Sequence, residues 1–348
     1  PPGNYTFRVK ASNNAGLWNE QGTALHIAIL PPWYKTWWAR SLLTLLVVGG
    51  AVGFYFFRIN QIKARNRMLA EQVAARTADL NQANKALQER QEEIIQQNTH
   101  ITDSINYAKR IQTALLPDFS LLETYFSESF VFYKPREIVS GDFYWFKEAG
   151  NYIVFATADC TGHGVPGAFM SMLGIAYLNE LVNAGSLPDT QYILEMLRKN
   201  IKSSLRQSAE GYSSREGMDI ALAVLEPRQK RLYFSGAHLP LYLIRKGELS
   251  IIKGDRMAVG PSRKEKPFTS YQIQLQSGDN LYFFTDGYID QFDAQNREKF
   301  KARRFKSLLK EIGHLPMQEQ KKAIQEKFMQ WRGKTRQLDD VLVIGVRL

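Results

Sequence analysis

An uncharged apolar run, Ser41–Phe57, is the feature that most constrains how this chain can fold. The run SLLTLLVVGGAVGFYFF contains no Asp, Glu, Lys or Arg. With Trp37 and Trp38 it reaches the length of about 20 residues that crosses a hydrocarbon layer about 30 Å thick. A buried core helix is the competing explanation. The unbroken apolarity and the aromatic residues at both ends favour a single transmembrane helix over 37–58.

Basic residues on the two sides of this run predict its orientation. Four follow it closely and two precede it: Arg58, Lys63, Arg65 and Arg67 against Lys35 and Arg40. Cytoplasmic flanks carry the excess of Lys and Arg, so we expect the C-terminal part of the chain in the cytoplasm.

The first 32 residues read as the end of a small β domain. Residues 4–10 alternate in polarity, 24–30 are apolar, and SNNAG between them supplies turn residues. Alone this segment is too short to bury a core. The chain begins with Pro rather than Met, so we expect a fragment whose missing N-terminus could include a signal peptide.

Residues 59–117 show a heptad pattern. Apolar residues recur every seven positions: Val73, Leu80, Leu87, Ile94, Ile101, Ala108 and Leu115. This predicts a long helix with a coiled-coil seam and therefore a homodimer. The complementary seam is mostly polar: Asn84, Gln91, Asn98, Ile105 and Gln112. Two interpretations stay open, a plain dimeric stalk and a marginal coiled coil whose geometry changes when the preceding domain moves.

Composition narrows the classes of function. The chain has 348 residues, of which 44% are hydrophobic and 23% charged, which is typical of folded domains and suggests two or three units. Its net charge of +11 suits nucleic acid, an anionic membrane or a solvated face. No zinc-finger or aromatic RNA-binding pattern accompanies the charge, so we predict no nucleic-acid partner. A single cysteine excludes an internal disulfide and multi-cysteine zinc sites.

After residue 117 the pattern becomes globular. Strand-like runs lie at 129–134, 152–158, 219–225, 231–236, 241–244, 281–285 and 341–346, and helix-like runs near 166–183, 189–207, 300–312 and 316–331. Strands in hairpin order with helices between the blocks indicate an α+β fold of antiparallel sheets with packed helices.

Four short motifs place aspartates beside apolar strands. They are SGDFYW with Asp142, TADCTGHG with Asp159, FFTDGYID with Asp286, and QLDDVLVIG with Asp339 and Asp340. Any one of them can be ordinary turn chemistry. As a set they offer the hard oxygen ligands that Mg²⁺ or Mn²⁺ requires. Two such ions clamp a phosphoryl group and generate a hydroxide, and converging carboxylates without a cation would repel one another.

Cys160 and His163 lie between these motifs, in ATADCTGHGVPGAF. A thiol phosphatase would need an arginine soon after the cysteine, and residues 161–169 contain none. A zinc site built on the pair lacks partners at the usual spacing. We therefore expect Asp159 to carry the chemistry and Cys160 to contribute only its backbone carbonyl. The glycines of TGHGVPG allow close backbone approach and begin the next helix.

Six ordered motifs over about residues 100–348 resemble the metal-dependent protein phosphatases of type 2C. They are IQTALLP, SGDFYW, ADCTGHG, SGAHLPLYL, TDGYID and DDVLVIGV. The chain is most similar to the bacterial SpoIIE-type branch, which dephosphorylates serine on regulators of sigma-factor partner switching. The resemblance implies a protein serine/threonine phosphatase domain at 118–348. It further implies two antiparallel sheets sandwiched between helices (αββα), two Mn²⁺ or Mg²⁺ ions, and attack by a metal-bridging hydroxide.

The resemblance also implies roles for individual residues. Asp159 would bridge the two ions, the Cys160 carbonyl would bind one, Asp286 and Asp339 would hold the second, and Asp142 would contact the first directly or through water. Asp339 is preferred to Asp340 because the first acid of the pair matches the family ligand. Asp159 and Asp286 are accordingly the principal catalytic candidates.

The chain departs from the family pattern at several positions. Trp145 stands where the branch often has a second acid. His163 is a candidate proton donor, although its spacing from Asp159 differs, and packing at the start of the helix is the alternative. His238 is similarly ambiguous. Arg136 suits contact with a phosphate, or it is a solvated surface residue.

The N-terminal piece is similar to the end of the β-sandwich that follows β-propeller repeats in bacterial periplasmic sensors. This implies a single-pass protein of the bacterial inner membrane with a periplasmic N-terminal part and a cytoplasmic phosphatase. A phosphoprotein, such as an anti-sigma factor antagonist, would be the substrate. We hypothesise that four residues dock the stalk on the core and transmit its geometry: Ile105, Ile111, Leu115 and Leu116.

Two other functions compete. A catalytically decayed phosphatase fold would act as a signalling scaffold, although all four acidic motifs are retained. A nucleotide cyclase is suggested by the similarity of SGDFYW to the GGDEF-type signature. That fold would not explain TDG or the terminal DDVLVIGV.

Overall fold

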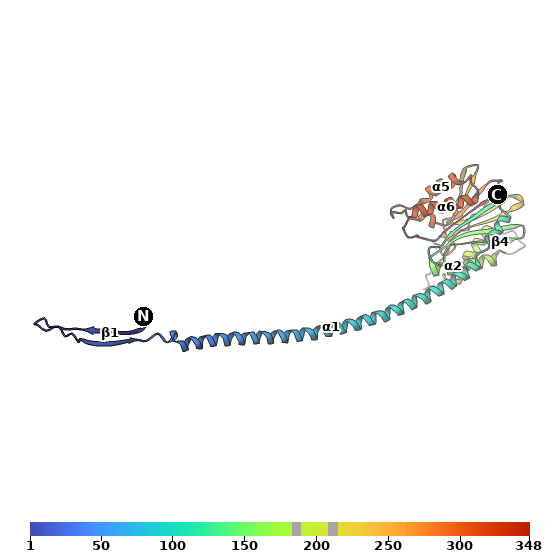
Figure 1. The fold of residues 1–348 in the computed structure, drawn as a ribbon. Coiled ribbons are helices and arrows are strands. Elements are labelled where there is room, and N and C mark those ends of the chain that lie inside the picture. The colour runs from blue at the N-terminus through green and yellow to red at the C-terminus, as the bar shows by residue number, and fades with distance from the viewer. Residues whose placement is uncertain (183–188, 208–214, 263) are drawn as a thin grey trace. The chain divides into compact units, whose positions relative to one another are not determined.

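The computed structural model describes residues 1–182, 189–207, 215–262 and 264–348. The chain divides into two units, Pro1–Ile95 and Gln96–Leu348, and the boundary falls within the long helix seen in Figure 1. The second unit therefore includes the last part of the predicted linker, residues 96–117, in addition to the predicted phosphatase domain.

The first unit contains a hairpin and most of a long helix. Strand β1 (Gly3–Val9) pairs antiparallel with β2 (Thr23–Ile29), which confirms the two predicted strands. All residues of both strands are exposed. A short 3-10 turn, Trp33–Lys35, precedes helix α1 (Trp37–Leu115).

Helix α1 is continuous over 79 residues and covers both the apolar run and the heptads. Its most apolar 18-residue window has a mean hydropathy of 1.9, and none of that window is buried. Within the described part of the chain, α1 is the one helix long and apolar enough to cross a membrane. Most heptad residues are exposed, for example Leu80 at 61% and Leu87 at 67%. The coiled coil and the dimer stay predictions.

The second unit is built on two five-stranded antiparallel sheets. The first has the order β10 (Tyr271–Gln274), β7 (Arg231–Ala237), β6 (Met218–Glu226), β5 (Tyr152–Cys160), β4 (Phe143–Ala149). The second has the order β3 (Glu128–Lys134), β12 (Val341–Arg347), β11 (Asn280–Phe284), β8 (Leu241–Arg245), β9 (Glu248–Ile252). All seven predicted strands are present, and β4, β9 and β10 were not predicted.

Helices cover the outer faces of both sheets. Helices α2 (Gly164–Leu181) and α3 (Thr190–Ser204) contact the first sheet, and α5 (Lys301–Ile312) and α6 (Met317–Arg332) pack on the second. Shorter helices are η2 (Phe119–Thr124), η3 (Pro227–Gln229) and α4 (Gly287–Asp290). Helices α2, α3, α5 and α6 confirm the four predicted helices. Residue 183, the last residue of the first predicted helix, lies outside the described residues.

Alternation along the strands builds the sandwich, because successive side chains point to opposite faces of a sheet. In β5, Val154 and Ala156 belong to the core under α2 and α3, whereas Ile153 and Phe155 belong to the core between the sheets. In β11, Phe283 likewise faces the inter-sheet core and its neighbour Phe284 the core under α5 and α6. The predicted αββα sandwich is confirmed.

Antiparallel pairing gathers the acidic motifs at one end of this sandwich. The C-terminal end of β5 lies beside the N-terminal ends of β4 and β6, and the C-terminal end of β11 beside the N-terminal end of β12. Each of the four motifs lies at one of these strand ends, so distant parts of the sequence meet there.

The end of α1 contacts the core through Gln112, which was not among the residues expected to dock. Gln112 is only 4% exposed, and its Nε2 donates to the Ser140 carbonyl at 2.6 Å and to Ser171 Oγ at 2.8 Å. Of the four residues expected to dock, Leu116 packs against the core under α2 and α3. The docking expectation was wrong for Ile111 and Leu115, which are 43% and 41% exposed. The face of α1 that is turned to the core is the one that carries Gln112, and Ile111 and Leu115 lie to one side of it, because the helix turns once in about 3.6 residues.

Candidate active site

A pocket of 330 Å³ opens at the end of the sandwich where the motifs meet. Four carboxylates line it: Asp159, Asp219, Asp286 and Asp339. Cys160, His163 and the backbone between them complete the wall, and no Lys or Arg is among the described lining residues. The pocket therefore concentrates negative charge without a basic counter-charge in its own wall.

Asp159 and Asp219 form the side of the pocket that belongs to the first sheet. They are directly opposite each other in the β5–β6 ladder. Both have the parity of the inter-sheet residues of their strands, such as Phe155 and Ala221. Partial burial, followed by the charges of Asp286 and the other carboxylates, raises the pKa of Asp159 to about 8.

Asp286 and Asp339 come from the second sheet. Asp286 precedes α4, and Gly287 after it lies so close to the Asp340 carbonyl that a Cβ there would clash. This close approach holds the TDG and DD segments together. Burial and then the charge of Asp339 raise the pKa of Asp286 to about 6. The pKa of Asp339 is also raised by burial, while Arg136 and His163 act in the opposite direction.

Asp142 lies behind the pocket wall rather than in it. It is 2% exposed, and its Oδ2 accepts a hydrogen bond from Thr285 Oγ1 at 2.6 Å, which ties the two sheets together. Burial and the neighbouring charge of Asp159 raise its pKa well above the usual range. A carboxylate in this position suits the predicted role that acts through water.

The carboxylate of Asp340 is bound by the protein backbone. One carboxylate oxygen accepts the Arg136 backbone N–H at 2.6 Å and the other the Gly141 N–H at 2.8 Å. It is 2% exposed and does not line the pocket. Both oxygens are thus engaged by the loop that carries Asp142, which favours Asp339 as the ligand of the pair.

Cys160 is 3% exposed, and burial followed by the surrounding carboxylates raises the pKa of its thiol well above the usual range. Its side chain belongs to the hydrophobic core under α2 and α3. The thiol is therefore neither exposed nor ionised, and the backbone of Cys160 is what the pocket can use.

The two other catalytic candidates, His163 and Arg136, have different surroundings. His163 lines the pocket, and its Nδ1 lies 2.9 Å from Glu137 Oε1. Arg136 does not line the pocket, although its charge acts on Asp339. The Nε atom of Arg136 is buried and has no hydrogen-bond partner among the described residues.

Sequence reasoning missed Asp219, which pairs with the ambiguous candidate His238. His238 Nδ1 lies 2.8 Å from Asp219 Oδ1, and His238 adopts a left-handed backbone conformation with φ of 55°. That conformation is uncommon outside glycine and costs free energy. Like the other aspartates of the site, Asp219 lies at the end of an apolar strand, because it opens the run DIALAVL. That position is the signal by which the sequence could have identified it.

The donor set fits hard divalent cations. No three His, Cys, Asp or Glu side chains of the described residues converge closely enough to hold an ion alone. Mg²⁺, however, keeps several waters and usually takes only one or two carboxylates. Pocket carboxylates with raised pKa values and a nearby backbone carbonyl are the oxygen ligands such an ion prefers.

The αββα sandwich and its acid-lined pocket define a phosphatase domain of the type 2C class. The profile of the family described as Stage II sporulation protein E (SpoIIE) matches residues 149–348. The chain belongs to this family, which supports a serine/threonine phosphatase.

Solved structures show the same fold. The SiaA-PP2C domain of Pseudomonas aeruginosa is 32% identical with a TM-score of 0.65, over 72% of this chain and 98% of that domain. The PP2C domain of Bacillus subtilis SpoIIE with part of its regulatory domain is 20% identical with a TM-score of 0.51, over 63% of this chain and 61% of that one. The latter similarity shows the fold alone.

Among curated proteins, histidine kinase P4 of Formosa agariphila is 35% identical over 82 residues, which is 23% of this chain. The chain spans 6% of that protein's length.

Proposed function

We propose that the chain is a membrane-anchored, metal-dependent protein serine/threonine phosphatase. The observation that most directly supports this proposal is the pocket at the end of the sandwich. Four aspartates line it, and no Lys or Arg is among its described lining residues. Like charges that line one pocket raise one another's pKa values, and a divalent cation is the natural counter-charge.

Two Mn²⁺ or Mg²⁺ ions in this pocket would supply a water-derived nucleophile at neutral pH and neutralise charge on the phosphoryl oxygens. Asp159, with the Cys160 carbonyl, would hold one ion. Asp286 and Asp339 would hold the other. Asp219 adds a carboxylate on the first-sheet side, and Asp142 would contact the first ion directly or through water.

Protein groups would then position the phosphate and move protons. Glu137 orients the imidazole of His163 through Nδ1, which leaves Nε2 as the atom that can exchange a proton with substrate or water. We retain Arg136 as a candidate phosphate contact, because its guanidinium lies near enough to act on Asp339. His238 orients Asp219 in the same way that a carboxylate–histidine pair fixes a ligand.

The substrate we propose is a phosphoserine or phosphothreonine of a regulatory protein, such as an anti-sigma factor antagonist. Membership of the SpoIIE family supports this class of substrate. The fold is also shared with the RsbU and RsbW domains of a Mycobacterium tuberculosis protein, at 18% identity and a TM-score of 0.51.

We further propose a place in the cell and a mode of control. The apolar part of α1 would cross the bacterial inner membrane once, with the hairpin periplasmic and the phosphatase cytoplasmic. The exposed heptad residues of α1 would form a homodimeric coiled coil. Gln112 would then couple the stalk to the SGD loop through Ser140.

The test is phosphate release by the fragment 60–348 from p-nitrophenyl phosphate and from a phosphoserine protein, with and without Mn²⁺. Asp159→Asn is the variant, and Asp293→Asn, which changes an acid outside the pocket, is the matched control. We expect Mn²⁺-dependent activity that Asp159→Asn abolishes and the control keeps. A folded fragment that neither hydrolyses these substrates nor binds Mn²⁺ by calorimetry would instead support the decayed scaffold.

A further inference from the structure

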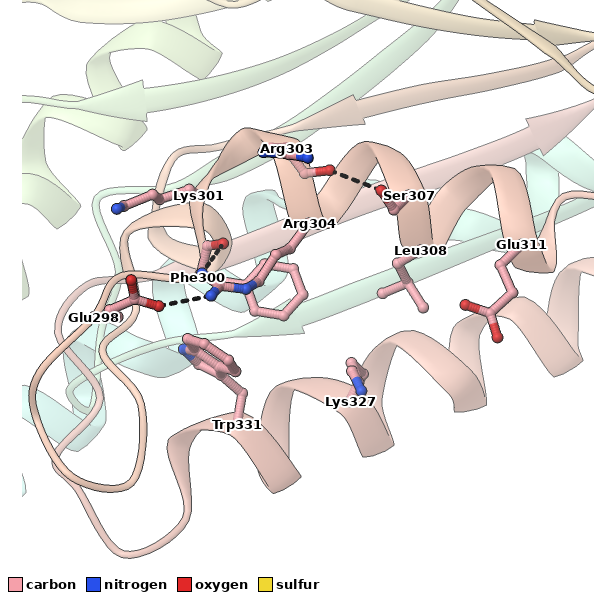
Figure 2. A pocket seen from close by; sticks show the side chains of 10 residues that line it. All are labelled: Glu298, Phe300, Lys301, Arg303, Arg304, Ser307, Leu308, Glu311, Lys327 and Trp331. Carbon is pink, nitrogen blue, oxygen red and sulfur yellow. Dashed lines mark hydrogen bonds and ion pairs between the residues drawn. The ribbon is translucent and has the colours of Figure 1, made fainter.

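A second pocket, of 570 Å³, lies between α5 and α6 (Figure 2). Its floor is apolar, formed by Phe300 and Leu308, and Trp331 stands on one side. The guanidinium of Arg304 lies 4.7 Å from the centre of the Trp331 ring and is paired with Glu298 at 2.6 Å. This arrangement gives the pocket a cation–π wall.

Three further cations border the pocket: Lys301, Arg303 and Lys327. All three are exposed, and their side chains have no ion pair or hydrogen bond among the described residues. Glu311 is the one acid of the lining that is left after Glu298 pairs with Arg304, within the part of the chain that the structure describes. The pocket therefore presents uncompensated positive charge.

The charge belongs to a larger pattern in the sequence. Residues 301–336, which include both helices, contain eleven Lys or Arg and three Glu, a net charge of +8 out of +11 for the whole chain. Three of these cations are in the first turn of α5, which has no acid. Cations there oppose the helix dipole and cost stability, so their presence is better explained by binding than by folding.

An acidic protein segment suits this surface better than a lipid bilayer. Interfacial helices insert Trp, Phe or Leu beside their basic residues. On the described face of α5 and α6 the one large hydrophobic residue that is strongly exposed is Met329, at 46%. A concave pocket with a cation–π wall instead accommodates a carboxylate side chain and its neighbours.

The pocket is physically connected to the active site. Trp331 Nε1 donates to the Gln291 carbonyl at 3.0 Å, and the Gln291 side chain accepts the Leu338 N–H at 3.0 Å. Gln291 is fully buried and follows α4, which begins next to Asp286, while Leu338 directly precedes Asp339. A partner seated in the pocket is thus bound to the same loops that carry two of the proposed metal ligands.

We propose that the pocket between α5 and α6 docks an acidic segment of the phosphoprotein substrate, outside the catalytic pocket. This inference rests on the proposed phosphatase function. Its role is to raise the affinity for the protein substrate, so a small substrate such as p-nitrophenyl phosphate does not use it.

Binding is tested directly with a fluorescein-labelled Glu-rich peptide of about 12 residues, followed by fluorescence anisotropy on the fragment 60–348. The variant is R303E/K327E, and the matched control, R228E/K253E, reverses two exposed cations outside the pocket. We expect binding that weakens between about 50 and about 200 mM NaCl, falls at least tenfold in the variant and changes less than twofold in the control. R303Q/K327Q replaces the first variant if that one does not fold.

Kinetics separate this proposal from the proposed function. Two phosphoserine peptides of equal length, one flanked by Glu and one by Gln, are compared with p-nitrophenyl phosphate. We expect the wild type to show a lower KM for the Glu-flanked peptide, the variant to lose that preference, and hydrolysis of p-nitrophenyl phosphate to stay within twofold. Inactivity of the wild type on every substrate would refute the phosphatase, while anisotropy would still report on docking.

Two results would overturn the docking proposal. One is equal binding of the acidic peptide by wild type and R303E/K327E. The other is that the peptide does not bind, while phosphatidylglycerol vesicles or single-stranded DNA bind in a way that the same variant abolishes. In that case the surface serves a membrane or a nucleic acid.

Discussion

Replacing Gln112 by Ala is the sharpest test of coupling between the stalk and the active site. The change removes three hydrogen bonds, to the Ser140 carbonyl, from the Ser140 N–H and to Ser171 Oγ. Each bond contributes about 1 kcal/mol, so the free energy of unfolding should fall by about 3 kcal/mol. Ser171 Oγ keeps its bond to the Ala168 carbonyl at 2.9 Å, which limits the loss.

Part of this loss should be visible in metal affinity. Ser140 is two residues before Asp142, and Gly141 between them donates to Asp340. Once Ser140 is released, the SGD loop must be ordered again when the ion binds. If half of the lost free energy, about 1.5 kcal/mol, is recovered only in the metal-bound state, the Kd for Mn²⁺ rises by slightly more than tenfold.

The assay is urea unfolding and Mn²⁺ calorimetry of the fragment 60–348, with p-nitrophenyl phosphate hydrolysis at saturating Mn²⁺. Gln96→Ala, an exposed glutamine on the same helix, is the control and should match the wild type. We expect a lower urea midpoint at unchanged slope, weaker Mn²⁺ binding and activity restored by excess Mn²⁺. A destabilised variant with wild-type Mn²⁺ affinity would refute the coupling and leave α1 as a brace.

Three further predictions follow from the site. The raised pKa of Asp159 means that the folded, metal-free protein binds a proton more tightly than the unfolded chain. This contribution to stability is present below about pH 4 and is lost as pH rises to about 8, so Asp159→Asn should flatten the fall in melting temperature over that range. His238→Asn, which tolerates the left-handed backbone, should keep the melting temperature but lower kcat/KM about tenfold, because Asp219 loses its partner. Gly287→Ala should destabilise the protein by about 3 kcal/mol or more in urea unfolding, because its Cβ would clash with the Asp340 carbonyl.

The sequence predicted those parts of the fold whose signal is local. Apolar runs identified seven strands, since a strand between two cores reads as continuous hydrophobic sequence. The three strands that escaped are different. The residues of β9 and β10 are mostly exposed, and in β4, which reads FYWFKEA, the charged residues Lys147 and Glu148 interrupt the apolar run. All three lie at sheet edges, where neighbouring strands stabilise a strand whose own pattern is weak. The edge strand β3, by contrast, keeps an apolar run and was predicted.

Contacts between segments far apart in the chain could not be predicted from local sequence patterns. Gln112 occupies a polar position of the heptad repeat, where a coiled coil uses such residues to set register. Only the folded unit reveals that this face of α1 meets Ser140 and Ser171 instead.

The same reasoning explains why the carboxylate cluster was predictable as a set and not in its details. Antiparallel pairing forces aspartates at alternate strand ends to one edge, so Asp159, Asp286 and Asp339 share a pocket for topological reasons. Which acid faces the pocket depends on two things: the face of the strand to which its position points it, and the backbone N–H groups nearby. Asp219 is opposite Asp159 in the ladder and points into the pocket, whereas two backbone N–H groups hold Asp340 away from it. Burial, and then the repulsion between carboxylates, raises the pKa values of Asp159 and Asp286 and costs stability without a cation. A fold that keeps so costly an arrangement is best explained by the ions that relieve it.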